Sequence, residues 1–349
     1  MNLKPTLENR SIQTSVPCRI DLGGTLDIAT FYLPMAALNP STVNIALDLR
    51  THVTLTPWTQ DRVKISSTGF ESVEIQRRNA SFDHAMGLMS AIVTYFDVHG
   101  VHVHIHSTSP PKSALGGSSC AAVALIAAFY LAMEKDLDPE HICWLAHHLE
   151  ASVAGVPCGT QDQTAAAFGG VNLWEWTFGR TGPAFVRQPV CRTLEHIEEL
   201  NDHILVAYCG IPHVSKDING QWVKSFVKGD SRRAFERVAG LTRAFAGALK
   251  EKNFSLAGQL MNKETRIRSE ITPQVLDKTG KKLFERAVAF KCGARFTGAG
   301  GGGCLWAVGE KEFIQSLSAE WKMILDRVDG AQLLNTRIDP QGIKYETQI

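Results

Sequence analysis

A loop of small residues carries the strongest chemical signal in the sequence. It reads KSALGGSS at 112–119 and lies between a strand-like run at 101–106 and an apolar run at 121–133. Small residues let the backbone approach a ligand closely, and the first N–H groups of a following helix lack partners within it. These donors and the positive end of the helix dipole favour phosphate. A turn followed by an ordinary N-cap is the alternative.

A second cluster of small residues lies at 298–303 and reads GAGGGG. Glycine loses more conformational entropy on folding than any other residue, so such a run indicates that something approaches the backbone closely. The run contains a formal G-x-G-x-x-G. However, the strand-like CLWAV at 304–308 follows it, whereas a dinucleotide-binding fingerprint must open a helix. A dehydrogenase is therefore excluded.

Four charged residues have the types and positions that a chemical site needs. Arg19 precedes the Gly-Gly turn at 23–24 and Asp27 follows it, so both side chains are candidates to face a polar ligand, or to form a salt-bridged strand end. Asp162 lies between two glutamines ahead of a small-residue run. It is either an ordinary N-terminal helix acid or a base aimed at a hydroxyl. Glu150 ends a helix-like segment and is either solvated or a metal ligand.

Composition excludes several classes of protein. Among 349 residues, 36 basic and 35 acidic side chains give a net charge of +1 without a basic stripe, so we expect no nucleic-acid partner. The polar start is not a signal peptide, and the longest apolar run is shorter than the roughly 20 residues of a membrane span, so we expect no membrane partner. Eight scattered cysteines without a C-x-x-C pair indicate a reducing, cytoplasmic setting.

The elements that must position these residues form two groups of strands and helices. Strand-like runs occupy 43–47, 53–55, 63–66, 73–76, 101–106 and 203–209. Helical spacing occupies 81–96, 121–133, 139–154, 232–250, 256–269 and 281–290, and the stretch 177–189 is predicted to be a connection. Because β-α-β alternation is irregular, the predicted fold class is α+β. The predicted domains are 1–190, with the phosphate loop, and 191–349.

Three segments together resemble the motifs of the GHMP kinases, a family that includes galactokinase, homoserine kinase, mevalonate kinase and phosphomevalonate kinase. The first runs from Pro17 to Asp27, the second from Pro110 to Ser119, and the third, GARFTGAGGGGC, from Gly293 to Cys304. The resemblance spans about residues 14–310. It implies a two-domain α+β fold with an N-terminal ribosomal-protein-S5-like domain and a C-terminal ferredoxin-like domain.

The resemblance also implies roles for individual residues. Asp162 resembles the family's catalytic aspartate, and Arg19 the arginine that pairs with it. ATP and Mg²⁺ are the expected cofactors, with Glu150 and Ser118 as metal ligands. The expected nucleotide-binding residues are Pro111, Lys112, Leu115, Gly116, Gly117, Ser118 and Ser119. The expected substrate-binding residues are Asp27, Gly24, Gly300, Gly301 and His213.

The phosphate loop departs from the family pattern at Ala114 and Gly117. Family members usually have Gly at the first position and Ser or Thr at the second. Since Gly117 offers no hydroxyl, Ser118 is the expected metal ligand and Ser119 is expected to cap a helix that begins at Cys120 or Ala121. The first motif is also about one residue shorter between Arg19 and Asp27 than in related sugar kinases.

The expected function is phosphoryl transfer from ATP to a sugar hydroxyl. The segments Arg-Ile-Asp-Leu-Gly-Gly and Gln-Asp-Gln resemble the branch of L-fucokinase and D-glycero-D-manno-heptose 7-phosphate kinase, which implies the anomeric C1 hydroxyl of a fucose- or heptose-like sugar. The alternatives are a galactokinase-like, uronic-acid or non-sugar kinase, and a non-catalytic regulator that binds ATP and sugar. A monomer or homodimer is expected.

Overall fold

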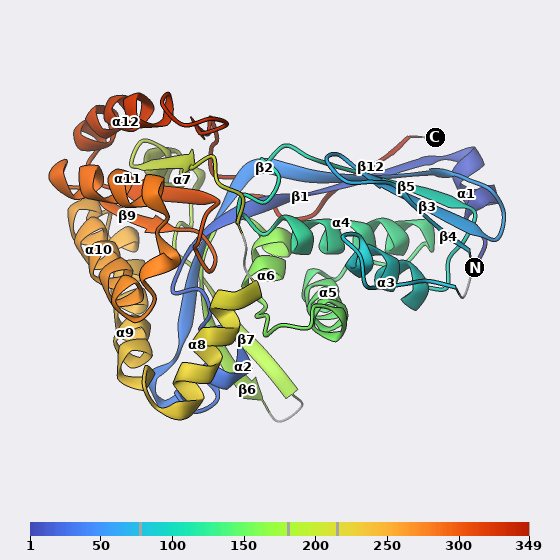
Figure 1. Ribbon diagram of the computed structural model, residues 1–349. Coiled ribbons are helices and arrows are strands. Elements are labelled where there is room, and N and C mark those ends of the chain that lie inside the picture. Colours follow the sequence, from blue (N-terminus) through green and yellow to red (C-terminus); the bar gives the residue numbers. More distant parts are fainter. Residues whose placement is uncertain (77–78, 180–181, 214–215, 349) are drawn as a thin grey trace.

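The computed structural model describes residues 1–76, 79–179, 182–213 and 216–348 (Figure 1). The α-helices are α1 (Lys4–Asn9), α2 (Ala29–Tyr32), α3 (Gly87–Tyr95), α4 (Gly117–Ala132), α5 (Pro139–Val153), α6 (Gln161–Phe168), α7 (Leu194–Asn201), α8 (Lys216–Lys228), α9 (Arg232–Lys250), α10 (Phe254–Ile271), α11 (Lys278–Ala289) and α12 (Lys311–Leu325). The strands are β1 (Ser11–Leu22), β2 (Ser41–Pro57), β3 (Arg62–Ser67), β4 (Val73–Gln76), β5 (Val101–Ser107), β6 (Val171–Gly179), β7 (Gly182–Pro189), β8 (Ile204–Tyr208), β9 (Gly293–Phe296), β10 (Cys304–Val308), β11 (Gln332–Leu333) and β12 (Lys344–Gln348).

A long antiparallel ribbon of β1 and β2 is the centre of the larger sheet. The strand order is β12-β1-β2-β5-β3-β4, and β6 pairs with both β2 and β7. The pairing of β1 with β2 shifts between Pro17 and Cys18, where proline can donate no ladder hydrogen bond. The two halves of β2 pair with different strands: residues 41–45 pair with β6, and residues 51–57 pair with β5.

Helix α4 is the central helix of this part of the molecule. It lies under β1 and β2 and contacts α3, α5 and α6 (Figure 1). Its own side chains are apolar or small on nearly every side, which is typical of a buried helix. Packing on all sides holds α4 in place, so the amides at its N-terminus are held at a fixed position.

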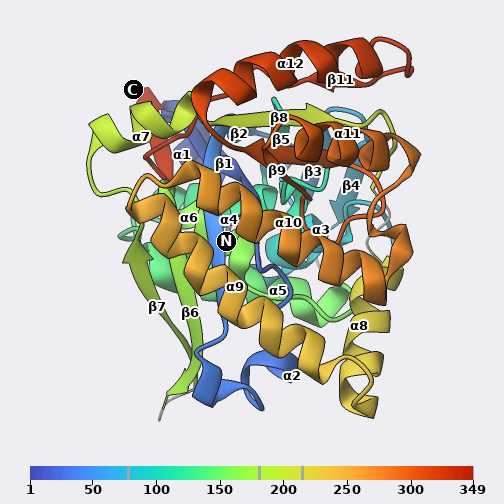
Figure 2. The same ribbon diagram turned by 90° about the vertical axis from the view of Figure 1, so that its left-hand side faces the viewer.

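The smaller sheet has the strand order β11-β8-β10-β9 and is antiparallel throughout. Along the chain, β8 is followed by helices, β9, β10, α12 and β11, which is the connectivity of a ferredoxin-like unit. Helix α10 contacts β9 and β10, and α12 contacts β8 and β11 (Figure 2). The α+β fold class is thus confirmed, and the ferredoxin-like expectation agrees with this connectivity.

The end of the chain returns to the larger sheet, whereas the second predicted domain was expected to extend over residues 191–349. Strand β12 pairs with residues 11–15 of β1, and Ile338 forms a bridge with Leu47. The buried Arg50 guanidinium of β2 also pairs with Asp339. The predicted boundary near 190 coincides with the change of sheet between β7 and β8, but the final segment belongs to the first sheet.

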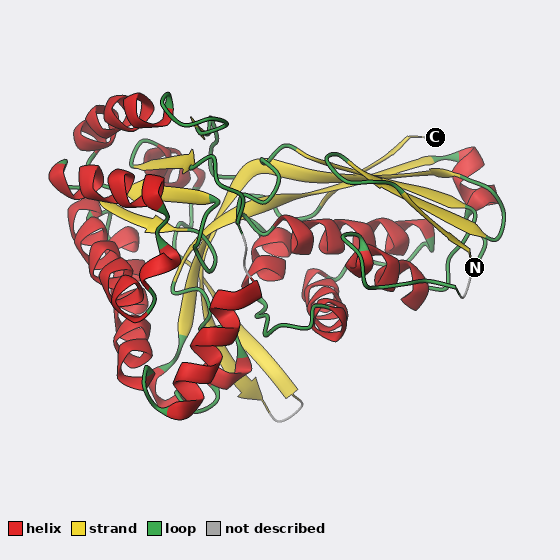
Figure 3. Ribbon diagram, in the orientation of Figure 1, coloured by secondary structure: helices red, strands yellow, loops and turns green. Residues whose placement is uncertain are grey.

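One predicted connection is wrong. The stretch 177–189 contributes to a hairpin of β6 and β7 (Figure 3). Its Gly and Pro residues suggested a loop, whereas cross-strand packing of Phe185 against Trp174 and Trp176 stabilises the hairpin. The predicted strands at 43–47 and 53–55 are parts of the single strand β2.

Two helix starts also differ from the sequence-based expectation. Helix α3 begins at Gly87 rather than near residue 81, and α4 begins at Gly117 rather than near residue 121. None of the described helices combines the length and apolarity that crossing a membrane requires. All eight cysteines are free thiols, and seven of them are buried.

Candidate active site

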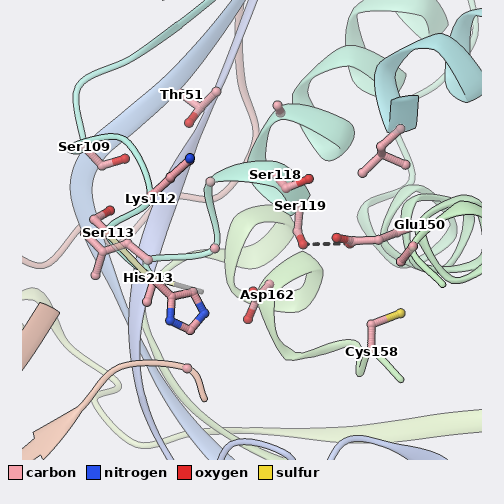
Figure 4. A pocket seen from close by; sticks show the side chains of 18 of the residues that line it. Thr51, Ser109, Lys112, Ser113, Ser118, Ser119, Glu150, Cys158, Asp162 and His213 are labelled. Carbon is pink, nitrogen blue, oxygen red and sulfur yellow. Dashed lines mark hydrogen bonds between the residues drawn. The ribbon is translucent and has the colours of Figure 1, made fainter. Parts of the chain in front are cut away.

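A cavity of about 510 Å³ lies between the phosphate loop, α5, α6 and the glycine cluster. It is lined by residues from both groups of elements, including Arg19, Asp27, Glu150, Asp162 and His213. Figure 4 shows the phosphate loop on one side, with the side chains of Asp162 and His213 below it. The structure therefore brings most of the predicted site residues together.

The phosphate loop is held open by backbone conformations that favour glycine. Lys112, Ala114 and Gly116 have φ values of 54°, 60° and 81°, which lie in the left-handed region. The conformation of Ala114 explains why glycine is usual there in the family, although this chain tolerates alanine. A Cβ on Gly116 would lie 3.2 Å from an Asp162 carboxylate oxygen. Gly116 is thus needed for both conformation and space.

The glycine cluster and two residues near it, Cys304 and His213, pack against the phosphate loop. Cys304 N donates to Ser113 O at 2.9 Å, and His213 N donates to Lys112 O at 2.8 Å. A Cβ on Gly303 would lie 2.6 Å from Ser113 O. At least one glycine of the cluster is therefore explained by close contact with another backbone segment.

The structure contradicts the predicted helix cap at Ser119. Helix α4 begins at Gly117 with Gly116 as N-cap, and no side chain caps it. The Ser119 hydroxyl is buried and donates to Glu150 Oε2 at 2.8 Å (Figure 4). Ser118 is exposed and its side chain makes no hydrogen bond among the described residues. Ser119, not Ser118, is the serine that contacts the predicted metal ligand.

Asp162 and Arg19 form the ion pair that the family resemblance implied. Arg19 Nε donates to Asp162 Oδ1 at 2.8 Å, and Nη2 lies 2.7 Å from the same oxygen. Arg19 Nη1 donates to Ala114 O at 2.7 Å, which ties the pair to the phosphate loop. Burial lowers the pKa of Arg19, but the Asp162 and Asp21 carboxylates outweigh it and raise the pKa above its ordinary value. Arg19 is therefore a permanent cation beside Asp162.

Asp27 lines the cavity and is 4% exposed. Its Oδ2 accepts from Gln161 N at 2.9 Å, so it satisfies a free donor at the start of α6. A Cβ on Gly159 would lie only 1.8 Å from Oδ2. Burial raises the pKa of Asp27 to about 6. One oxygen thus anchors α6, while the carboxyl borders the cavity.

Glu150 lies beside Ser119, at the C-terminal end of the phosphate loop. Its Oε2 accepts from Ser119 Oγ and also from Gln163 Nε2 at 2.6 Å. Burial raises the pKa of this carboxyl to about 7. The described residues contain no group of three or more His, Cys, Asp or Glu side chains able to hold a metal ion. A carboxylate and a hydroxyl nevertheless fit Mg²⁺, which is usually bound by one or two protein oxygens together with water and phosphate.

Of the other residues predicted to bind substrate, His213 lines the cavity and the three glycines do not. His213 lines the cavity, burial lowers its pKa, and its Nδ1 makes no hydrogen bond within the described residues. Gly24, Gly300 and Gly301 are not among the described residues that line the cavity; Gly298 and Ala299 are. Gly301 N instead donates to Val275 O at 2.9 Å. A Cβ on Gly300 would lie 2.5 Å from Val275 O, and one on Gly24 would lie 2.4 Å from Asp21 Oδ2, so close packing accounts for glycine at both positions.

Two buried residues that sequence reasoning missed lie next to the site. Gln163 donates to Glu150, and Asp21 Oδ1 accepts from Gly298 N at 2.7 Å. The Gln-Asp-Gln triplet was a signal for Gln163. The polar residue inside a buried strand was a signal for Asp21.

Comparison with known proteins places part of the chain in a family. Residues 83–170 match the family "GHMP kinases N terminal domain". The chain carries a GHMP kinase N-terminal domain. The phosphate loop, Glu150 and Asp162 all lie within this GHMP kinase domain.

Relatives of the GHMP kinase domain include enzymes with different acceptors. The chain is 24% identical over 312 residues to D-glycero-alpha-D-manno-heptose 7-phosphate kinase of Campylobacter jejuni, covering 85% of this chain and 89% of that enzyme. It is 28% identical over 264 residues to mevalonate kinase of Pyrococcus furiosus, covering 72% and 70%. The fold matches that of a D-glycero-D-manno-heptose 1-phosphate kinase from Bacteroides thetaiotaomicron with a TM-score of 0.73 at 15% identity, covering 96% and 98%.

Proposed function

We propose that this protein is an ATP-dependent kinase that transfers the γ-phosphoryl group to a sugar hydroxyl. The observation that carries the proposal is the Arg19–Asp162 ion pair, which lies against the phosphate loop within the cavity. Phosphoryl transfer depends mainly on positioning and on neutralisation of charge, and this arrangement offers both. The heptose kinase and mevalonate kinase relatives support the reaction class.

The phosphate loop is assigned to the nucleotide. The N–H groups at the start of α4 and the dipole of this 16-residue helix favour the phosphates. Nearby lining residues include Phe70, Met86, Met89 and Ile105, whose apolar side chains suit the faces of a nucleobase. This division separates nucleotide contacts from the polar residues around Asp162.

Glu150 and Ser119 are assigned to Mg²⁺. When bound, the ion supplies positive charge beside the phosphates. Glu150 supplies a carboxylate oxygen and Ser119 a hydroxyl oxygen, while Gln163 orients the carboxylate through its own hydrogen bond. The assignment moves the serine ligand from Ser118 to Ser119.

Asp162 is assigned to the acceptor hydroxyl, as the base that takes its proton or as the group that orients it. Arg19 keeps the carboxylate in place through two of its nitrogens. Asp27 and His213 are assigned to other hydroxyls of the acceptor, because both border the cavity and His213 Nδ1 is unpaired within the described residues. The C1 hydroxyl of a fucose- or heptose-like sugar is the proposed position of transfer.

The test is an ADP-release assay with the complete chain, ATP and Mg²⁺ against free and 7-phosphorylated heptoses, fucose, galactose, uronic acids and mevalonate. We expect turnover with a sugar, and a decrease of at least about a hundredfold in Asp162→Asn. ATP affinity should be retained in that variant, as measured by calorimetry. Near-normal turnover of Asp162→Asn would remove Asp162 from the chemistry. ATP and sugar binding without turnover in the wild type would favour a regulator instead.

A further inference from the structure

A network of charged side chains extends from helix α10 to the cavity. Neighbouring members have opposite charges. In order they are Arg268 and Glu264 on α10, Arg295 on β9, Asp21 and Arg19 on β1, and Asp162 on α6. The first four are completely buried, and Arg19 is 3% exposed. Removing charges from water costs more free energy than their attraction usually returns. Such a network is therefore a poor device for stability alone.

Glu264 joins two arginines of this network, Arg268 and Arg295. Its Oε1 accepts from Arg268 Nε at 2.9 Å, and its Oε2 accepts from Arg295 Nε at 2.9 Å. Each carboxylate oxygen therefore holds a different arginine. The single side chain sets the spacing between the two guanidinium groups.

Arg268 holds the turn that leads to Asp27. Its Nη2 donates to Gly24 O at 2.6 Å, and its Nη1 donates to Thr25 Oγ1 at 3.1 Å. Thr25 has a φ of 81°, which is a strained conformation for a β-branched residue and persists only when its surroundings enforce it. Thr25 and Asp27 both line the cavity. Arg268 therefore enforces the shape of the acceptor side.

Arg295 holds the beginning of the glycine cluster. Its Nη1 donates to Asp21 O and Asp21 Oδ2, each at 3.0 Å. The other oxygen of Asp21 accepts from Gly298 N at 2.7 Å, and Gly298 lines the cavity. A Cβ on Gly298 would lie 3.5 Å from Arg19 Nη2, so this loop borders the Arg19–Asp162 pair.

We propose that Glu264 is a positioning residue for phosphoryl transfer. Through Arg268 and Arg295 it holds the turn at 23–27 and the loop at Gly298 in register on either side of Asp162. The inference rests on the proposed function. Glu264 lies on α10, which packs against the smaller sheet, and it does not line the cavity. It therefore acts on the reaction only through the residues that it holds.

The decisive variant is Glu264→Gln, whose amide has one acceptor oxygen and serves only one arginine. We expect hydrogen exchange to become about tenfold faster at Leu26, Ile28 and Gly298, whose amides are hydrogen-bonded in the two loops. Exchange at Cys120, which donates within α4, should stay unchanged. Unchanged exchange at the loop amides would overturn the proposal, whatever the enzyme's activity.

Kinetics give the second readout. In Glu264→Gln the KM for the acceptor should rise about tenfold, while the KM for ATP stays within about twofold. Loss of folded protein alone changes neither KM. Asp339→Asn is the matched control, because it disrupts another buried ion pair, with Arg50, and neither of these two residues lines the cavity. It should lower the melting temperature and leave the acceptor KM unchanged.

The outcomes separate the two proposals. Equal acceptor KM values in the wild type and Glu264→Gln would overturn the positioning role while the kinase assignment stands. A wild type inactive with every acceptor would overturn the kinase assignment, and the exchange measurement would still decide whether Glu264 holds the two loops. If Glu264→Gln does not fold, Arg268→Lys tests the turn alone, since lysine cannot span Gly24, Thr25 and Glu264. It should accelerate exchange at Leu26 and Ile28, and normal exchange there would overturn the proposal.

Discussion

At the scale of single residues, the cavity places two carboxylates in different surroundings. Asp162 pairs with the Arg19 guanidinium. Glu150 accepts hydrogen bonds from Ser119 and Gln163, and burial raises its pKa to about 7. A buried carboxyl of this kind takes up a proton near neutral pH unless a cation compensates it. This difference suits one residue to the acceptor and the other to a metal ion.

The raised pKa of Glu150 predicts a pH-dependent demand for Mg²⁺. As pH falls through about 7, a proton competes with the ion, so the half-saturating Mg²⁺ concentration should rise about tenfold per pH unit. Above about pH 8 it should be constant. The measurement is a Mg²⁺ titration of turnover at several pH values, with Glu150→Gln as control. A half-saturating concentration independent of pH in the wild type would contradict the assignment.

The raised pKa of Glu150 also makes the stability of the protein depend on pH. The folded state holds the proton of Glu150 more tightly than the unfolded state does. The contribution of this proton to stability is therefore fully present below about pH 4.5 and is lost as pH rises through about 7. Without Mg²⁺, the melting temperature of the wild type relative to Glu150→Gln should therefore fall between pH 5 and 8. Thermal unfolding of both proteins checks the sign, and a parallel pH dependence would be the contrary result.

At the scale of elements, the start of α4 decides which serine serves the site. Successive side chains on a helix point about 100° apart, so a start at Gly117 turns Ser119 inward and leaves Ser118 exposed. The predicted cap at Ser119 assumed a later helix start, and the proposed metal ligand is therefore Ser119 rather than Ser118. The reversal can be tested directly.

We predict that Ser119→Ala raises the Mg²⁺ requirement and slows turnover, because Glu150 loses both a neighbouring ligand and a hydrogen bond. The lost bond should also lower stability by about 1 kcal/mol. Ser118→Ala is the matched control and should change neither property appreciably. Mg²⁺ titration and thermal unfolding of the two variants decide the point. A metal defect confined to Ser118→Ala would restore the original assignment.

Two adjacent glycines of this element should respond in opposite ways. Gly116→Ala adds a side chain in the left-handed region and near Asp162, and should cost about 1–2 kcal/mol with a loss of turnover. No atom lies within 4 Å of a Cβ on Gly117, so Gly117→Ala should be neutral or stabilising by up to about 1 kcal/mol. Denaturant unfolding measures both changes. Equal effects at the two positions would show that backbone conformation is not the cause.

At the scale of the whole molecule, the larger sheet is completed by the end of the chain. Arg50 is buried in β2, where Ser15 accepts from it on one side and the carbonyls of Gln341 and Gly342 accept on the other. Asp339 supplies its counter-charge. The last residues of the chain therefore neutralise a charge in the centre of the first sheet.

Deletion of residues 337–349 should destabilise the protein by at least about 3 kcal/mol, because it leaves a buried guanidinium unpaired. It also removes β12 from the edge of β1. Thermal or urea unfolding of the shortened chain gives the measurement. Asp339→Asn, which retains the carbonyl partners, should be affected less. A shortened chain as stable as the intact one would show that this segment is dispensable.

The sequence alone determined the features that depend on local patterns. Alternating and helical periodicities identified several of the strands and helices, including α9 at its observed bounds. The small-residue loop, the glycine cluster and the three ordered motifs indicated a phosphate site, because their spacing reflects backbone requirements within short segments. The pairing of Arg19 with Asp162 was implied by the family resemblance and agrees with the observed contact.

Only the tertiary structure decided which distant groups meet. The hydrogen bond between Ser119 and Glu150 depends on how α4 packs against α5. The two arginines on Glu264 come together because α10 lies across β9. The return of β12 to β1 joins opposite ends of the chain. Periodicity specifies which face of an element is buried but not which element covers it, and these contacts arise from packing between segments far apart in sequence.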